Sequence, residues 1–231
     1  MNKLCVITGA SRGIGLELVR KYTDIGYEVF ACCRNLSSGL ESFDIKTGKI
    51  IKDVDVSQEE GITTLITAIG DRKIDLLINN AGILNVDHKK DIQKSRNDIR
   101  SQFEVNSIAP LMVTLALYNN NNFRIGSRIA VISSRMGSIS DNSSGSYYGY
   151  RMSKAAVNCA IKSLSIDMKD DGVSILSLHP GYVDTDMTAR TVSDQKITTD
   201  TSVNGLVNVI ENMSMDITGK FYSYTGDEIG W

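Results

Sequence analysis

The sequence predicts an α/β fold in which helices cover both faces of a doubly wound parallel sheet. Three observations predict it. Apolar strand-like runs alternate with helix-length amphipathic runs, and the first strand-like run leads directly into a glycine-rich turn. The length of 231 residues suits one domain with a sizeable core. Strands that alternate with helices of this length imply right-handed crossovers, which make the strands parallel.

The strand-like runs are short, apolar and separated by polar segments. They cover residues 3–8, 27–33, 49–53, 74–79, 127–133, 173–178 and 219–223. Helices are expected between them, at residues 13–25, 58–71, 97–118, 151–171 and 202–213. In the first helix, Leu16, Leu18, Val19 and Tyr22 have the spacing of one apolar face. No repeat or linker interrupts the series, so residues 1–231 are expected to form a single domain.

The composition is that of a globular protein, with 42% hydrophobic and 23% charged residues. The net charge of −2, without Lys/Arg runs, argues against a nucleic-acid partner. No apolar stretch approaches the length of a membrane span, so no membrane partner is expected. The first strand begins within three residues of Met1 and leaves no room for a signal peptide. A cytoplasmic location is therefore expected.

The cysteines have no spacing that suggests a bridge or a metal site, because no C-x-x-C or Cys/His pattern occurs. With only two histidines in the chain, no metal is expected. All four cysteines are interpreted as core residues with free thiols: Cys5, Cys32, Cys33 and Cys159.

The glycine-rich turn reads Thr8-Gly9-Ala10-Ser11-Arg12-Gly13-Ile14-Gly15. Glycines permit a tight turn and let main-chain N–H groups approach a pyrophosphate. The helix N-terminus that follows carries partial positive charge. The simpler alternative is an ordinary strand-to-helix turn. The context of strand, turn and helix favours a dinucleotide site, contacted by Gly9, Ser11, Arg12, Gly13, Ile14 and Gly15.

The end of the second strand favours NADP(H) over NAD(H). An acidic residue there usually binds the ribose 2′-hydroxyl of NAD, but this strand is followed by Arg34 and Asn35, with no carboxylate. A guanidinium suits a 2′-phosphate, and Arg12 offers a second cation nearby. The alternative is that both arginines are simple surface charges.

Tyr150 and Lys154 lie four positions apart, so both can face one point from the same helix. A phenol with a pKa near 10 is a poor acid or base at neutral pH, and a nearby ammonium favours its phenolate. Tyr150 would therefore exchange a proton with the substrate oxygen, with Lys154 lowering its pKa. The pattern is also common at the start of a plain amphipathic helix. Tyr147 and Tyr148 lack a lysine four positions later.

Four motifs follow one another along the chain: Thr8-Gly-x-x-x-Gly-x-Gly, Asn79-Asn-Ala-Gly, Tyr150-x-x-x-Lys and Pro180-Gly-x-Val-x-Thr. In this order they resemble the short-chain dehydrogenase/reductase family over essentially the whole chain. Residues 132–139, 150–156 and 218–231 are most similar to carbonyl reductases of the C-factor and sniffer type. The resemblance implies one Rossmann-fold domain and hydride transfer between a nicotinamide and a carbonyl or alcohol.

The resemblance also implies roles for individual residues. Ser134, three residues before Gly137, would orient the reacting oxygen, whereas Ser133 would be structural. Asn106 would hold a proton-relay water near Lys154, or alternatively bond its own helix. The adenine would lie on Asp55 and Val56, and Thr185 would bond the carboxamide. Further cofactor contacts are expected from Tyr150, Lys154, Asn79, Ala81, Gly82, Pro180, Gly181 and Val183.

The sequence therefore predicts an NADP(H)-dependent carbonyl reductase or alcohol dehydrogenase with a small-molecule substrate that it does not name. Residues 186–201 are expected to close as a lid, and the long loop 138–149 to shape the pocket. Residues 85–100 fit a solvated helix face or a subunit contact. Two alternatives remain open, namely an NADP(H) sensor without turnover and an epimerase or dehydratase. The family resemblance further implies a homodimer or homotetramer that assembles through residues 97–118 and 151–171.

Overall fold

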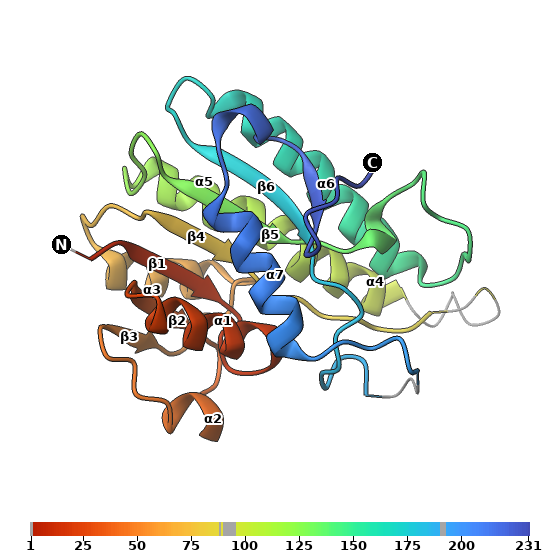
Figure 1. Ribbon diagram of the computed structural model, residues 1–231, viewed down its shortest axis with the longest axis horizontal. Helices are drawn as coiled ribbons and strands as arrows, with labels where there is room; N and C mark the ends of the chain where they lie inside the picture. Colours follow the sequence, from red (N-terminus) through yellow and green to blue (C-terminus); the bar gives the residue numbers. More distant parts are fainter. Residues whose placement is uncertain (1, 88, 90–95, 190–192) are drawn as a thin grey trace.

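The computed structural model describes residues 2–87, 89, 96–189 and 193–231 (Figure 1). Seven parallel strands form one sheet in the order β3-β2-β1-β4-β5-β6-β7. All seven strands were predicted to within two residues at each end. Their bounds are β1 Leu4–Thr8, β2 Glu28–Cys32, β3 Gly48–Ile51, β4 Leu76–Asn79, β5 Arg128–Ile132, β6 Ser174–His179 and β7 Phe221–Ser223.

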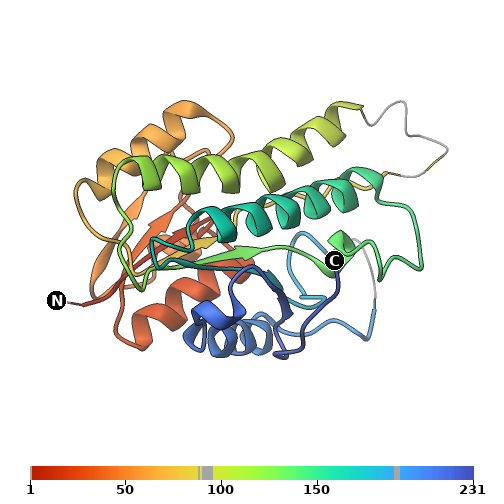
Figure 2. The same cartoon turned by 90° about the horizontal axis from the view of Figure 1, so that it is seen from above.

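Helices cover both faces of this sheet (Figure 2). Their bounds are α1 Gly13–Asp24, α2 Ser38–Glu41, α3 Glu59–Ile69, α4 Arg96–Phe103, α5 Ala109–Asn119, α6 Tyr148–Asp167 and α7 Thr199–Glu211. The helices α3, α4, α5 and α6 lie on one face, and α1 and α7 lie together on the other. The predicted doubly wound α/β fold is confirmed.

The core has two halves, one on each face of the sheet. Neighbouring residues of β1 alternate between the two halves. Leu4 and Val6 pack on the face covered by α3, α5 and α6. Cys5 and Ile7 pack on the face covered by α1 and α7. Alternation follows from the period of two along a strand. Because both faces are buried, every residue of β1 is apolar except the last, Thr8.

The strand order reverses at β1, which lies between β2 and β4. In open sheets of this kind a crevice forms beyond the carboxyl ends of the strands at such a reversal. Thr8 ends β1 here, and its hydroxyl accepts the backbone N–H groups of Asn80 at 3.1 Å and Ala81 at 3.2 Å. These bonds join the glycine turn to the segment that follows β4.

Three helices differ from their predicted form. The predicted helix 97–118 is divided into α4 and α5 by a π-helical turn, Glu104–Ile108. The structure begins α6 at Tyr148, three residues earlier than predicted, so Tyr150 lies inside the helix. The structure also begins α7 at Thr199, because the Thr198 hydroxyl caps it by accepting the Thr201 N–H at 3.1 Å.

Other sequence-based expectations need correction or fall outside the described residues. The short helix α2 was not predicted, and Cys159 is exposed, whereas Cys5, Cys32 and Cys33 are buried as expected. None of the four cysteines is in a disulfide. Residues 88 and 90–95 of the segment 85–100, and residues 190–192 of the expected lid, lie outside the described residues. Within the part that is described, no helix is both long and apolar enough to cross a bilayer.

Candidate active site

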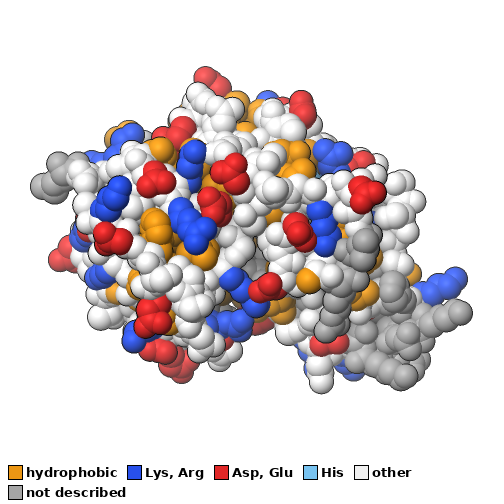
Figure 3. Space-filling model, turned by 60° about the horizontal axis from the view of Figure 1, so that its bottom comes forward, with side chains coloured by type: hydrophobic (Ala, Val, Ile, Leu, Met, Phe, Trp, Pro, Cys, Tyr) orange, Lys and Arg blue, Asp and Glu red, His pale blue; other side chains and the backbone are white. Residues whose placement is uncertain are grey.

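A cavity of about 570 Å³ lies at the carboxyl ends of the strands. Figure 3 shows a hollow with charged side chains at its rim. Such a volume is typical of small-molecule and cofactor sites. The cavity brings together most of the residues that the sequence singled out: Gly9, Ser11, Arg12, Gly13, Ile14, Gly15, Arg34, Asp55, Val56, Ala81, Gly82, Tyr150, Lys154, Pro180 and Thr185.

The glycine turn is held tightly against the end of β4. Gly9 has φ +65°, and a Cβ there would lie 2.7 Å from the Ala81 Cα, so no side chain fits. The Asn80 amide donates to the carbonyls of Thr8 and Gly9, at 3.0 Å each. The N-cap residue of α1, Arg12, makes no side-chain cap bond, and this end of the helix faces the cavity. An open helix N-terminus fits a phosphate group.

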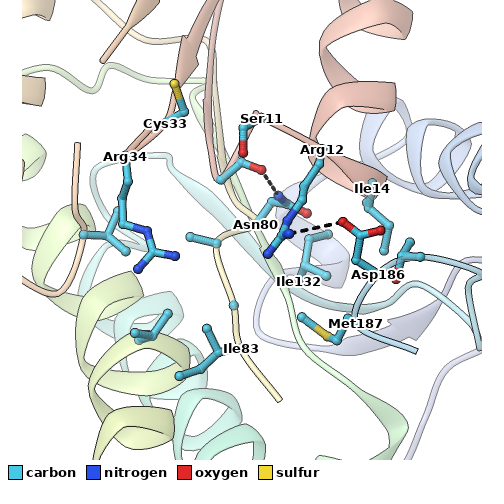
Figure 4. Close-up of a pocket in the computed structure, with 18 of the residues that line it drawn as sticks. Ser11, Arg12, Ile14, Cys33, Arg34, Asn80, Ile83, Ile132, Asp186 and Met187 are labelled. Atoms are coloured by element: carbon cyan, nitrogen blue, oxygen red, sulfur yellow. Dashed lines mark hydrogen bonds and ion pairs between the residues drawn. The ribbon is translucent and has the colours of Figure 1, made fainter. Parts of the chain in front are cut away.

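Two guanidinium groups reach the cavity from different elements (Figure 4). Arg12 Nη1 lies 3.1 Å from Asp186 Oδ2, and Arg34 Nη1 lies 3.8 Å from Asp55 Oδ2. Burial raises the pKa of Asp55, but two hydrogen bonds from Ser57 and the charge of Arg34 outweigh it, so the net shift is downward. With two cations beside the open helix end, these residues fit a phosphorylated dinucleotide.

Tyr150 and Lys154 are both buried on one face of α6 and line the cavity. Burial raises the pKa of Tyr150 to about 12, and the neighbouring Ser134 hydroxyl opposes that shift. Burial also lowers the pKa of Lys154 to about 8. Lys154 Nζ donates to the Ile132 carbonyl at 2.8 Å and lies 5.8 Å from the centre of the Tyr150 ring.

The two serines after β5 have different surroundings. Ser134 begins the 3₁₀ turn Arg135–Gly137, and its Oγ accepts the Met136 N–H at 3.2 Å. Ser133 lines the cavity, but its hydroxyl donates to Asn158 Oδ1 at 2.7 Å in the interior. The Ser134 hydroxyl is therefore the one placed beside the Tyr150 phenol.

Asn106 lies in the π-helical turn and does not line the cavity. Its Oδ1 accepts the Ile83 N–H at 2.9 Å, and its Nδ2 donates to the Ile83 carbonyl at 2.9 Å and to Ser153 Oγ at 3.0 Å. The side chain thus bonds a neighbouring segment and α6, and the alternative of bonding its own helix does not hold. A water relay near Lys154 stays a prediction.

Asn79, Gly181, Val183 and Ser134 also lie outside the cavity lining. Asn79 points into the core, where its Nδ2 donates to Thr114 Oγ1 at 3.2 Å. Its neighbour Asn80 lines the cavity instead, because the side chains of successive strand residues point to opposite faces of the sheet. Gly181 packs against Tyr224, and Val183 is buried.

Several lining residues were missed from the sequence, among them Leu36, Ser37 and Ile83, whereas Met187 belongs to the predicted lid segment 186–201. Ser37 caps α2 by accepting the Leu40 N–H at 3.2 Å, and its hydroxyl donates to the Ser11 carbonyl. The serine at that position is an N-cap signal that could have revealed α2. Ile83 is an apolar residue in a loop, and no local pattern marks it as a cavity residue.

A family model for short chain dehydrogenases matches residues 3–196. The chain belongs to this family. The 1-hydroxy-2-glutathionyl-2-methyl-3-butene dehydrogenase of Rhodococcus sp. (strain AD45) is 31% identical over 229 residues, covering 98% of each chain. The C-signal protein of Myxococcus xanthus is 37% identical over 165 residues, covering 68% of this chain and 93% of that one.

Among solved structures, the NADPH-bound carbonyl reductase from chicken fatty liver superimposes with a TM-score of 0.88 at 28% identity, covering 100% of this short-chain dehydrogenase and 99% of that chain. The resemblance inferred from the motifs is confirmed, and so is the oxidoreductase class. The roles of the individual site residues, the substrate and the preferred cofactor are taken up as proposals.

Proposed function

We propose that this short-chain dehydrogenase interconverts a carbonyl compound and its alcohol with NADP(H), and that Tyr150 is its general acid and base. The observation that carries the proposal is that the Tyr150–Lys154 pair and the open glycine turn line one cavity. A nicotinamide dinucleotide in that cavity would supply or accept the hydride. The protein's own residues would hold the substrate oxygen and move its proton.

Tyr150 would donate its phenolic proton to the carbonyl oxygen during reduction and would take a proton from the alcohol in reverse. Ser134 would donate a hydrogen bond to the same oxygen, since its hydroxyl neighbours the phenol. Burial disfavours the phenolate that reduction leaves on Tyr150. The ammonium of Lys154, on the same helix face, would offset that penalty while it is protonated.

The cofactor would be held by two groups of residues. The turn from Gly9 to Gly15 and the α1 N-terminus would bind the pyrophosphate. Asp55 and Val56 would border the adenine, whereas Ala81, Gly82, Pro180 and Thr185 would border the nicotinamide end. We also propose that Arg12 and Arg34 select NADP(H), because guanidinium groups suit a 2′-phosphate and no carboxylate follows β2 directly. The NADPH bound to the chicken carbonyl reductase supports this preference.

The test is NADPH consumption by the purified protein with a panel of small aldehydes, ketones and quinones, repeated with NADH. Turnover with NADPH is expected to fall by at least about a thousandfold in Tyr150→Phe, because that variant keeps the ring but has no proton to give. Tyr148→Phe removes a half-exposed hydroxyl two residues earlier and is the matched control.

Each outcome separates the proposal from its alternatives. Tight NADPH binding by a protein that turns over none of the substrates would favour an NADP(H) sensor. Conversion of a substrate without net NADPH consumption would favour an epimerase or dehydratase. Wild-type turnover by Tyr150→Phe would show that another group supplies the proton.

A homo-oligomer is proposed as well, because large apolar side chains are exposed on the helices that the family resemblance implicates. Ile108, Met112 and Tyr118 lie along the π-helical turn and α5, and Met152 and Ile166 lie on α6. Exposed apolar side chains on neighbouring helices are typical of protein interfaces. Sedimentation that gives a stable monomer at micromolar concentration would refute this proposal.

A further inference from the structure

The segment of residues 83–87 is bonded along its length to the helix beside it. Asn106 bonds both the N–H and the carbonyl of Ile83, and Gln102 Oε1 accepts the Asn85 N–H at 3.0 Å. Gln102 and Asn106 are four residues apart, so their amides project from one helix face. The segment is thereby held in a fixed path from the cavity to Asp87.

Asp87 joins this segment to the start of α6. Its side chain is 2% exposed, and its Oδ2 accepts the Gly149 N–H at 2.8 Å. Its backbone carbonyl accepts the Tyr147 N–H at 3.1 Å. Both acceptors of Asp87 therefore bond the beginning of α6. Asp87 and Gly149 are 62 positions apart in the sequence.

The start of α6 needs such an anchor. Its N-cap residue, Tyr147, makes no side-chain cap bond to the helix. Ser146 and Tyr147 have φ +54° and +53°, in the left-handed region that is unfavourable for residues with a side chain. A carboxylate at a helix N-terminus bonds an open N–H group and interacts favourably with the helix dipole. Asp87 supplies that carboxylate from a distant segment.

The packing around Gly149 leaves no room for a side chain. A Cβ on Gly149 would lie 2.7 Å from Gln102 Nε2 and 3.0 Å from Asp87 Oδ2. Asp87 Oδ1 and Gln102 Nε2 are buried and have no partner among the described residues. Burying the Asp87 carboxylate is costly, and the hydrogen bond from the Gly149 N–H to Asp87 Oδ2 offsets part of that cost.

We propose that Asp87 is a positioning residue that fixes Tyr150 by anchoring the first turn of α6. Tyr150 directly follows Gly149, so loosening this turn displaces the phenol from Ser134, whereas Lys154 lies one turn further along the helix. This inference rests on the proposed role of Tyr150. Asp87 itself is not among the residues that line the cavity.

Enzyme kinetics test the proposal through Asp87→Ala and Asp87→Asn. Asp87→Ala is expected to lower kcat by at least about tenfold while the Kd for NADPH changes less than about twofold, because only the phenol is displaced. Asp87→Asn keeps an acceptor oxygen and is expected to retain kcat within about threefold. Asp98→Ala, which removes an exposed contact with Asn85, is the matched control. A wild-type kcat in Asp87→Ala, or an equal loss in Asp87→Asn, would overturn the proposal.

Hydrogen exchange of the cofactor-free protein tests the anchor without relying on turnover. Exchange of the Gly149 amide is expected to accelerate by at least about tenfold in Asp87→Ala, with little change at Val157 and Ile161. Unchanged exchange at Gly149 would overturn the proposal even if Tyr150 has no catalytic role. If Asp87→Ala does not fold, Gly149→Ala is the second variant, because its methyl group displaces the same carboxylate. It is expected to give the same loss of kcat. A wild-type kcat in Gly149→Ala would overturn the proposal. Wild-type activity in Tyr150→Phe would instead refute the proposed function alone.

Discussion

Arg12 Nη1 and Asp186 Oδ2 lie 3.1 Å apart, so an ion pair joins the glycine turn to the segment that follows β6. The two residues are 174 positions apart in the sequence, and both side chains are largely exposed. Exposed pairs of this kind are worth little, on the order of 0.2–1 kcal/mol. A phosphate group at the cavity would therefore compete readily with Asp186 for the Arg12 guanidinium.

The first prediction follows from this competition. Asp186→Asn is expected to tighten NADPH binding by up to about fivefold, because Arg12 no longer has to leave a carboxylate. The gain should shrink at high salt, which screens exposed charges. The measurement is the Kd by NADPH fluorescence at low and high salt. Asp184→Asn is the control, since Asp184 pairs with Lys196. Weaker binding by Asp186→Asn would mean that Asp186 supports the cofactor.

Arg34 gives the second prediction. Arg34→Asp is expected to weaken NADPH binding by about tenfold or more and to change NADH binding much less, because only NADPH carries the 2′-phosphate. The carboxylate that Arg34→Asp introduces would also accept a hydrogen bond from the ribose 2′-hydroxyl of NADH. The Kd values of both cofactors are compared with those of Arg20→Asp, which makes the same charge change at an exposed site on α1. Unchanged selectivity would refute the assignment of Arg34.

Gly137 gives the third prediction, since it packs directly against the backbone of α6. A Cβ there would lie 2.7 Å from the carbonyl carbon of Lys154 and 2.8 Å from the Lys154 Cβ. Gly137→Ala is therefore expected to lower the free energy of unfolding by about 1–3 kcal/mol, as overpacking does. Urea denaturation measures it. In the control Gly39→Ala, the new methyl meets only the end of the Leu16 side chain, at 3.0 Å. Wild-type stability in Gly137→Ala would contradict the close packing.

His179 makes stability depend on pH. Its Nδ1 accepts the Arg135 N–H at 3.2 Å, next to Ser134. Burial lowers its pKa from 6.5 to about 4, and the charge of Arg135 adds to the shift. Between these two pKa values the unfolded chain binds more protons than the folded protein. The free energy of unfolding therefore falls as the pH drops from about 6.5 to about 4, by up to about 3 kcal/mol from this group.

The fourth prediction isolates this contribution. His179→Asn keeps an acceptor for the Arg135 N–H but does not titrate, so it should lose less stability between about pH 6.5 and about pH 4.5 than the wild type. Urea midpoints across that interval measure the difference. Carboxylates titrate in both proteins and cancel in the comparison. Parallel pH profiles for the two proteins would show that His179 is not held neutral.

Much of this molecule could be predicted from local patterns. The seven strands follow from apolar runs, and the glycine turn, Tyr150 and Lys154 follow from short motifs whose residues lie on one element. Prediction was poorer where the decisive partner is distant in sequence. Asn79 was predicted to contact the cofactor instead of Asn80, because two adjacent asparagines differ only in the side of the sheet toward which their side chains point. Likewise, α6 begins three residues earlier than predicted, and its first turn bonds Asp87, which is 62 positions away from Gly149 in the sequence.

By itself, the sequence determined the doubly wound fold, the family and the elements that carry the candidate site, because periodicity and motif spacing act within single elements. Only the tertiary structure decided which groups meet. It paired Arg12 with Asp186, bound Asn106 to Ile83, and placed Asp87 under the first turn of α6. These contacts depend on how helices and loops pack across the sheet. That packing is set by many side chains together and leaves no local pattern in the chain.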